Sequence, residues 1–435
     1  MVKKRLNALV AGSLVCGLAG SALANDEVAE LRNELASMRA ELAQVKAQTG
    51  ASWMDEAREA ELRAMVEDVV SDASTRTAFQ EGGLGAGHDG KKFYLEGEGF
   101  KMNIGGQLQF RYVFNQSDAR DGDSEELDGF EIRRAKLKLD GHIGDPKIGY
   151  KLVLTNSRSS GNTSLEDAVI SYKYDSGIKV SAGKMKLPFL FEELLSSSRQ
   201  LGVDRGLSTE FFTLNRAEQI QVAIPVEEAA KVYLAYSDGG NSESSNATAD
   251  TVDYAFTGRV QGKLAGEWSQ MKDLVAVDQD FAAFVGGAIH LQETEGAGGD
   301  ELLAWTVDGV IKTGNLAVMA AVMGASADVD DRDQFGILAQ AGYSIDKNWQ
   351  PFARFDYIDD DDNELTAITA GVNYYLAKHN AKFTADVVYL IEPENPGAVP
   401  GLNGGELSSG LGLSSTNVNE DDDQFAVRAQ FQLLF

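Results

Sequence analysis

Cysteine is nearly absent from the sequence, which contains a single one, Cys16. It lies in an N-terminal stretch that we expect to be cleaved on export, so the mature chain would form no disulfide and offer no thiolate to a metal. Beyond that stretch no run of about 18 uninterrupted apolar residues occurs, which excludes a membrane-spanning helix. Positive charge is also scarce, and the formal net charge of −28 disfavours nucleic-acid binding.

Motifs of common catalytic, metal and cofactor sites are missing as well. The sequence has no GxxxxGK(S/T) phosphate-binding loop and no GxSxG nucleophile elbow. Its four histidines are scattered without metal-ligand spacing. The acidic runs lack EF-hand spacing, so they favour a solvated surface over calcium ligands. We therefore expect a protein that is not an enzyme and that has no cofactor and no metal site.

The N-terminus predicts a secretory signal peptide at residues 1–24. Lys3, Lys4 and Arg5 precede a mostly apolar stretch, and Ala22-Leu23-Ala24 forms a small-x-small cleavage site. A retained membrane anchor is the alternative, which the cleavage site disfavours. The chain is therefore expected to leave the cytoplasm.

The segment 25–80 begins with a heptad pattern. Apolar residues recur at alternating spacings of three and four, at Val28, Leu31, Leu35, Met38, Leu42 and Val45. This pattern predicts a helical coiled coil, since a lone helix with so narrow an apolar stripe gains little stability. An amphipathic helix that lies on another surface is the alternative. The glycine-rich residues 81–92 are predicted to be a flexible linker.

From residue 93 to 435 the apolar periodicity changes to two, as in β-strands. In 100–112, for example, apolar side chains fall on one face and Lys, Asn, Gln and Arg on the other. The alternation predicts sixteen strands, an even number, as in bacterial single-chain barrels. Their predicted ranges are 100–114, 130–144, 147–156, 165–174, 178–187, 217–225, 231–237, 251–264, 281–292, 301–312, 316–325, 334–345, 348–358, 365–376, 381–391 and 424–435.

Short turns, such as Asp145-Pro146, alternate with long polar connections, such as 188–216 and 392–423. Short periplasmic turns with longer outer loops are typical of outer-membrane barrels. The final segment alternates up to Phe435, and a barrel would pair this edge with the first strand. The predicted fold class is all-β: a 16-stranded antiparallel transmembrane β-barrel with an N-terminal α-helical coiled-coil stalk. It would lie in the bacterial outer membrane, against lipid and lipopolysaccharide, with the stalk in the periplasm.

Basic residues of the first strands are out of phase with the apolar ones, so they are predicted to point into the lumen. Among them are Arg111, Arg134, Lys136 and Lys138. The phase breaks between Arg133 and Arg134, where a β-bulge would turn both guanidinium groups toward the pore. The alternative is that one of them extends to the lipid headgroups. Because a barrel of about sixteen strands encloses an aqueous lumen, we expect this polar interior to be wet.

Two segments resemble the phosphate-selective porins of the O and P type. They read Gly129-Phe130-Glu131-Ile132-Arg133-Arg134-Ala135-Lys136-Leu137 and Gly183-Lys184-Met185-Lys186-Leu187-Pro188-Phe189. The resemblance implies a homotrimer with one pore per subunit, and an inward-folded loop at 188–216 that narrows the pore. It also implies that Arg133 and Arg134 are pore arginines, that Lys184 or Lys186 is a constriction lysine, and that Arg199 and Arg205 lie on the narrowing loop.

The predicted function is passive diffusion of small polar solutes through a water-filled pore, with anions such as phosphate implied by the resemblance. Guanidinium and ammonium groups in a narrow lumen would replace part of an anion's hydration. Acidic residues outnumber basic ones from residue 321 onward, in runs such as Asp359 to Asp362. An acidic mouth repels anions within the screening length of about 8–10 Å. A general or cation-preferring porin is therefore one alternative, and an envelope-tethering structural barrel with an incidental pore is another.

Overall fold

A computed structural model of the chain describes residues 85–89, 92–118, 124–158, 160–240, 252–294, 301–328, 332–360, 364–391, 402, 411–413 and 423–435. The predicted signal peptide at 1–24 and coiled coil at 25–80 lie outside the described residues. The chain divides into two compact units, Met1–Ile104 and Gly105–Phe435. In the part of the chain that is described, no helix is long and apolar enough to cross a membrane.

The described part of the first unit is a small antiparallel sheet. β1 (Gly85–His88) pairs with β2 (Phe93–Gly97), and β2 pairs with the first residues of β3 (Phe100–Asp118). β1 therefore lies inside the segment 81–92, for which the sequence predicts a linker. Glycine permits this pairing, because a Cβ at Gly87 would come within 2.7 Å of the Tyr94 hydroxyl on the neighbouring strand.

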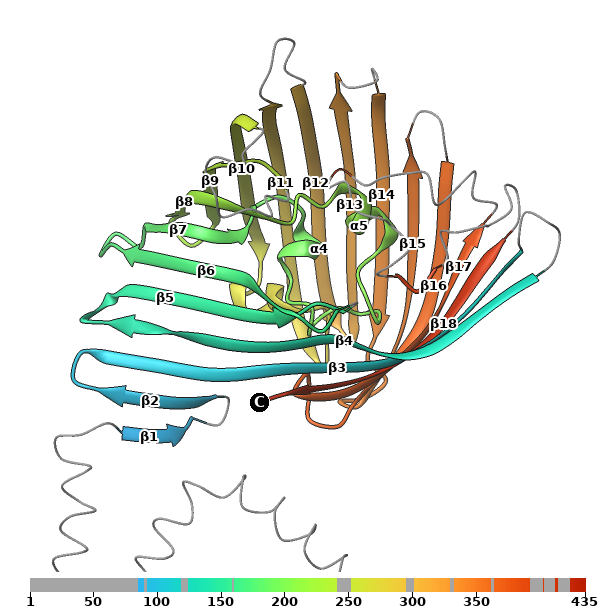
Figure 1. Ribbon diagram of the computed structural model, residues 1–435, viewed down its shortest axis with the longest axis horizontal. Coiled ribbons are helices and arrows are strands. Elements are labelled where there is room, and N and C mark those ends of the chain that lie inside the picture. The colour runs from blue at the N-terminus through green and yellow to red at the C-terminus, as the bar shows by residue number, and fades with distance from the viewer. Residues whose placement is uncertain are drawn as a thin grey trace, which may run out of the picture. The chain divides into compact units, whose positions relative to one another are not determined.

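A closed antiparallel barrel, formed by the sixteen strands β3 to β18, makes up the second unit from Gly105 onward (Figure 1). After β3 the strands are β4 (Ser124–Ile143), β5 (Asp145–Asn156), β6 (Thr163–Lys173), β7 (Lys179–Lys186), β8 (Arg216–Val226), β9 (Ala230–Ser237), β10 (Val252–Ala265), β11 (Gln279–Thr294), β12 (Glu301–Gly314), β13 (Leu316–Ala327), β14 (Arg332–Tyr343), β15 (Trp349–Asp359), β16 (Glu364–Tyr375), β17 (Ala381–Ile391) and β18 (Gln424–Leu434). All sixteen predicted strands are confirmed. The largest difference is at the start of β4, which begins at residue 124 instead of 130.

The barrel closes between its last and first strands. β18 pairs with β3 from Leu434↔Gln107 to Phe425↔Gln116. Phe435 also exchanges two backbone hydrogen bonds with Gly106, with N···O distances of 2.6 and 3.2 Å. Glycine is needed here, because a Cβ at position 106 would lie 2.2 Å from a carbon of the Phe435 ring. The predicted pairing of the last strand with the first is confirmed.

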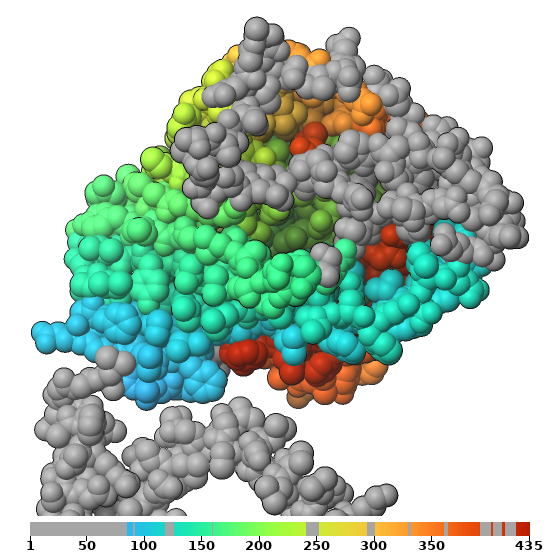
Figure 2. Space-filling view, in the orientation of Figure 1, coloured from blue at the N-terminus to red at the C-terminus, as the bar shows by residue number. Residues whose placement is uncertain are grey.

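Large apolar side chains cover the outer face of the barrel. Exposure alternates along the strands, so that on β15, for example, Trp349 and Phe355 are exposed while Gln350 and Asp356 are buried. In the space-filling view, β4 to β7 form a continuous outer wall (Figure 2). Such an extensive apolar surface around a polar interior is the pattern of a barrel embedded in lipid.

The connections differ between the two ends of the barrel. At one end they contain five residues or fewer, with the exception of 266–278, which carries the 3₁₀ helix η1 (Trp268–Lys272). The longest connections, 187–215, 238–251 and 392–423, lie at the other end, and residues 187–215 are described completely. They contain two short helices, α4 (Phe191–Leu194) and α5 (Leu207–Phe212). The predicted alternation of short turns and long loops therefore holds only in part. It fails at 266–278, and the connections after β3, β13 and β15 have five residues or fewer, because the strands beside them are longer than predicted.

Candidate functional site

The connection between β7 and β8, residues 187–215, folds into the barrel lumen, and we call it the inner loop (Figure 1). Its aromatic side chains Phe189, Phe211 and Phe212 are fully buried in one cluster with residues of the inner wall. Small side chains of that wall leave space for the loop, and they include Ala288, Ala304, Ala317, Ala325 and Ala367. The inward fold that the resemblance implies for 188–216 is therefore present.

Polar side chains on the inner face of four successive strands hold the backbone of the inner loop. The donors are Arg354, Asn373, Lys382 and Gln432, and they bind the carbonyl oxygens of Asp204, Leu201, Gln200 and Ser198 at 3.1, 2.8, 2.9 and 3.0 Å, respectively. Buried carbonyl groups need a donor, because leaving one unpaired costs about 1–3 kcal/mol. These contacts therefore fix the loop against β15 to β18.

Glu192 of α4 is the main carboxylate that anchors the inner loop. It is 1% exposed, and its Oε1 accepts hydrogen bonds from Gln340 at 3.0 Å and from Arg354 at 3.3 Å. Its Oε2 accepts from the Thr209 hydroxyl at 2.6 Å and from the Gly206 backbone N–H at 3.0 Å. Glu192 thus joins the two ends of the loop to β14 and β15.

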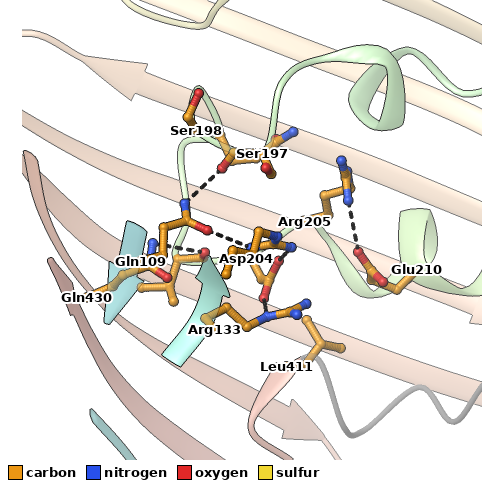
Figure 3. Close-up of polar contacts among 12 residues, drawn as sticks. Gln109, Arg133, Ser197, Ser198, Asp204, Arg205, Glu210, Leu411 and Gln430 are labelled. Atoms are coloured by element: carbon orange, nitrogen blue, oxygen red, sulfur yellow. Dashed lines mark hydrogen bonds and ion pairs between the residues drawn. The ribbon is translucent and has the colours of Figure 1, made fainter. Parts of the chain in front are cut away.

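Three arginines converge on the carboxylate of Asp204, and we call these four residues the Asp204 cluster. Figure 3 shows one of them, Arg133, against Asp204. Arg133 Nε lies 2.6 Å from Oδ2, Arg134 Nη2 lies 2.7 Å from Oδ1, and Arg111 Nη1 lies 3.1 Å from Oδ2. Arg133 and Arg134 are adjacent in sequence, yet both reach Asp204. Both guanidinium groups therefore face the lumen, which the break in apolar phase predicts.

The charge on Asp204 is fixed by its arginines. Burial opposes ionisation, but the charges of Arg133, Arg134 and Arg111 outweigh it and hold the pKa of Asp204 well below its usual range. Arg111 Nε also donates to the carboxylate of Glu131. Internal carboxylates therefore partly neutralise the three arginines.

A further ion pair lies on the inner loop beside this cluster. Arg205 Nη1 is 3.7 Å from Glu210 Oε1, and Arg205 Nη2 donates to the Glu193 carbonyl oxygen at 3.3 Å (Figure 3). Burial raises the pKa of Glu210, although the charge of Arg205 opposes this shift. The same loop carries Arg199, whose backbone N–H donates to the Ser196 carbonyl oxygen at 2.8 Å. Both loop arginines of the prediction thus lie on the inner loop.

Lysines extend the basic surface along β4. Lys136 Nζ lies 2.6 Å from Glu166 Oε1, and Lys138 Nζ donates to Gln107 Oε1 at 2.7 Å. Arg216, which the sequence prediction missed, binds Asp167 at 2.7 Å. Each of these cations faces the lumen with a polar partner.

The two candidate lysines of β7 have different surroundings. Lys186 ends the strand where the chain turns inward, and its Nζ donates to the carbonyl oxygens of Glu193 and Leu195. Lys184 lies opposite Glu218 on β8, and its Nζ is 3.6 Å from Glu218 Oε1. The Lys184 side chain is 14% exposed. Lys186 therefore contacts the inner loop, whereas Lys184 is paired with a carboxylate of the neighbouring strand.

The two halves of the lumen differ in their contact with solvent. On β10 to β18 two inner ion pairs are sealed: the side chains in the pairs Arg259–Asp308 and Arg428–Asp386 are at most 1% exposed. On the β4 to β8 side, Arg133 is 16% exposed and Lys151 is 53% exposed. The expectation of a wet interior therefore needs correction, because the apolar residues of the inner loop fill one half and solvent reaches the charged groups of the other.

Several residues of this site could not be identified from strand periodicity alone. Asp204 and Glu192 lie in a connection, where no alternation marks the inner face. Arg354, Asp386 and Arg428 occupy polar phases of their strands, which was a usable signal that they point inward. What periodicity could not provide is that the inner loop folds back to meet them.

Comparisons with known proteins agree with this architecture. Residues 102–292 match the family model of the phosphate-selective porins O and P. A protein of Aquifex aeolicus without an assigned function is 24% identical over 343 residues, which cover 66% of this chain and 82% of that protein.

Solved porins share the fold. The anion-selective porin from Comamonas acidovorans is 16% identical, has a TM-score of 0.55, and is matched over 77% of this chain and 99% of its own. OmpF of Salmonella typhi, solved in complex with daunomycin, is 14% identical with a TM-score of 0.52, over 78% of this chain and 100% of its own. The resemblance found in the sequence is thereby confirmed: the chain carries a porin barrel, and over residues 102–292 it matches the phosphate-selective porin O and P family.

Proposed function

We propose that this outer-membrane channel passes small polar solutes by diffusion and prefers anions, with phosphate as one candidate. The observation that carries the proposal is the asymmetry of the lumen. One half is sealed by the inner loop, whereas basic side chains of β4 and β5 keep contact with solvent, as Arg133 and Lys151 do. A solute that enters the lumen would therefore travel along a basic wall.

The proposed path is lined by several positively charged side chains. Its side chains are Arg111, Arg133, Arg134, Lys136, Lys138, Lys184, Lys186, Arg199 and Arg205. Most of those with a described side-chain partner already bind a carboxylate or a carbonyl oxygen, so an anion gains only part of their binding capacity. Several weak sites in series favour conduction, because an ion must be able to leave each site as well as enter it.

The assembly is also part of the proposal. We infer a homotrimer with one pore per subunit, surrounded by lipid and lipopolysaccharide, with the segment 25–80 as a periplasmic coiled coil. Support comes from the family match and from the heptad pattern of that segment.

Replacing both Arg133 and Arg134 with alanine tests the anion path. The anion-over-cation permeability ratio is expected to fall by on the order of tenfold, because two unit charges leave the narrow part of the lumen while Asp204 stays. Reversal potentials in a KCl gradient across a planar bilayer measure this ratio. Lys347→Ala is the matched control, since Lys347 lies exposed in the turn between β14 and β15 and its loss should leave the ratio unchanged. An unaltered ratio in the double variant would remove these arginines from the path.

A further inference from the structure

The connection 266–278 is unlike the other connections at its end of the barrel, which have five residues or fewer. We call it the strap. Three of its apolar side chains are buried in the cluster that also contains the inner loop: Met271 at 7%, Leu274 at 1% and Ala276 at 0% exposure. An ordinary surface turn would leave such side chains in solvent, so the strap is folded inward.

Asp273 pins the strap to distant parts of the barrel. Its Oδ1 lies 3.1 Å from Lys312 Nζ on β12, and its Oδ2 lies 3.3 Å from His379 Nε2 in the turn between β16 and β17. Lys312 Nζ also donates to the Val275 carbonyl oxygen at 2.9 Å, and Gln350 on β15 donates to the Leu274 carbonyl oxygen at 2.8 Å. The strap thus extends from β10 and β11 to the β16–β17 turn, across one half of the lumen.

The negative charge of Asp273 stabilises its contacts with Lys312 and His379. Burial opposes ionisation of Asp273, but the hydrogen bonds from His379 and Lys312 outweigh it and hold the pKa of Asp273 below its usual range. The carboxylate is therefore charged at neutral pH. A partly buried carboxylate with two cationic or polar partners on different elements restrains all of them together.

Two glutamines lie between the inner loop and the strap with its His379 turn. Gln432 donates to the carbonyl oxygens of both His379, at 2.6 Å, and Ser198, at 3.0 Å. Gln350, which holds the strap, lies beside Leu201 of the inner loop: a Cβ built on Gly342 would be 2.8 Å from Gln350 Nε2 and 2.9 Å from Leu201 Cδ2. The segment 198–201 therefore rests on groups that the strap and its His379 turn also bind.

We propose that the strap is a second constriction element, which supports the inner loop from the short-turn end and narrows the exit beneath it, with Asp273 as its positioning residue. This inference rests on the proposed channel function. The strap lies under the half of the lumen that the inner loop seals, so it also keeps the exit on the basic side of β4 to β8.

The test compares single-channel conductance of three variants in planar bilayers. In the first, residues 266–278 are replaced by an Asn-Gly turn, which suits a two-residue hairpin connection. In the second, Asp273→Ala removes only the contacts of this carboxylate with Lys312 and His379. The control is Asp346→Ala, which alters a turn carboxylate at the same end that accepts only from the backbone N–H groups of Asn348 and Trp349.

Conductance is expected to rise roughly twofold without the strap, and less in Asp273→Ala, because the loop gains freedom and the exit widens. Asp346→Ala should conduct like the wild type. Heat stability of the folded barrels in detergent is measured in parallel, since a purely structural strap would lower stability and leave conductance unchanged, which would overturn the inference. If the shortened variant does not fold, the conductance of Asp273→Ala decides. A wild type that carries no current would instead refute the channel function itself.

Discussion

Replacing Asp204 with asparagine is expected to raise the anion-over-cation permeability ratio about fivefold, since a unit charge at about 4 Å is worth about 1 kcal/mol even in bulk water. In the wild type this carboxylate binds Arg111, Arg133 and Arg134 at 3.1, 2.6 and 2.7 Å. An amide keeps nearly the same shape and one oxygen acceptor but removes the negative charge. The three guanidinium groups would then be available to a passing anion. Reversal potentials in a KCl gradient measure the change.

The pH dependence of the same measurement adds a check. Because the arginines hold the pKa of Asp204 well below its usual range, the wild-type cluster should keep its charge from neutral pH down to below pH 4. Asp204→Glu is the matched variant, since it restores the carboxylate and should return the ratio toward the wild-type value. If Asp204→Asn shows no shift, or a shift toward cations, the Asp204 cluster does not line the path.

Replacing Glu192 with alanine is expected to release the inner loop. Four hydrogen bonds reach this carboxylate, one of them from Arg354, and both members of that pair are 1% exposed. Removing one partner of a buried ion pair costs about 3–5 kcal/mol, because the other charge stays buried without compensation. The unfolding temperature in detergent should fall, and single-channel conductance should rise as the loop leaves its place against β14 and β15.

Glu210→Ala is the control for this experiment. Glu210 lies on the same inner loop, but its carboxylate is 24% exposed and 3.7 Å from Arg205. Partly exposed ion pairs contribute about 0–1 kcal/mol, so this variant should unfold close to the wild type. Equal losses in both variants would mean that Glu192 has no special part in holding the loop.

The barrel was predictable from the sequence because the alternation of apolar and polar residues can be recognised within each strand separately. Lipid on one side and polar groups on the other impose a period of two on each strand, and the period is legible without knowledge of the partners. The closing strand shows this: the alternation up to Phe435 predicts the pairing with β3 that the register confirms. The strand at 85–88 was missed, since its four residues, Gly85 to His88, are too few to display a period.

The site was predictable only in part, because its decisive contacts are not local. Arg133 and Arg134 could be assigned to the lumen from the phase break on β4. Their partner Asp204 lies about 70 residues further along the chain, in a connection without periodicity. The strap was hidden for the same reason: Asp273 meets Lys312 and His379 only after the barrel has closed.

The extent of the wet interior was overestimated for a related reason. A count of lumen-facing polar residues on the strands does not take into account the loop that covers part of the inner wall. Pairs such as Arg428 and Asp386 do face inward, yet they are sealed, because the inner loop covers them and the Val203 backbone N–H also binds Asp386 at 2.8 Å. The alternation along the strands predicts which side chains face the lumen. The course of the solvent path also depends on the inner loop, which folds into the lumen and covers part of the barrel wall.

The proposed function requires solvent and anions to pass along the basic side of the lumen between β4 and the inner loop. The decisive experiment is the reversal potential of the purified wild-type protein in a planar bilayer with a KCl gradient. We expect discrete conductance steps and a reversal potential of the sign that marks anion preference. Folded barrels that insert and carry no current, or that select for potassium, would rule out this path.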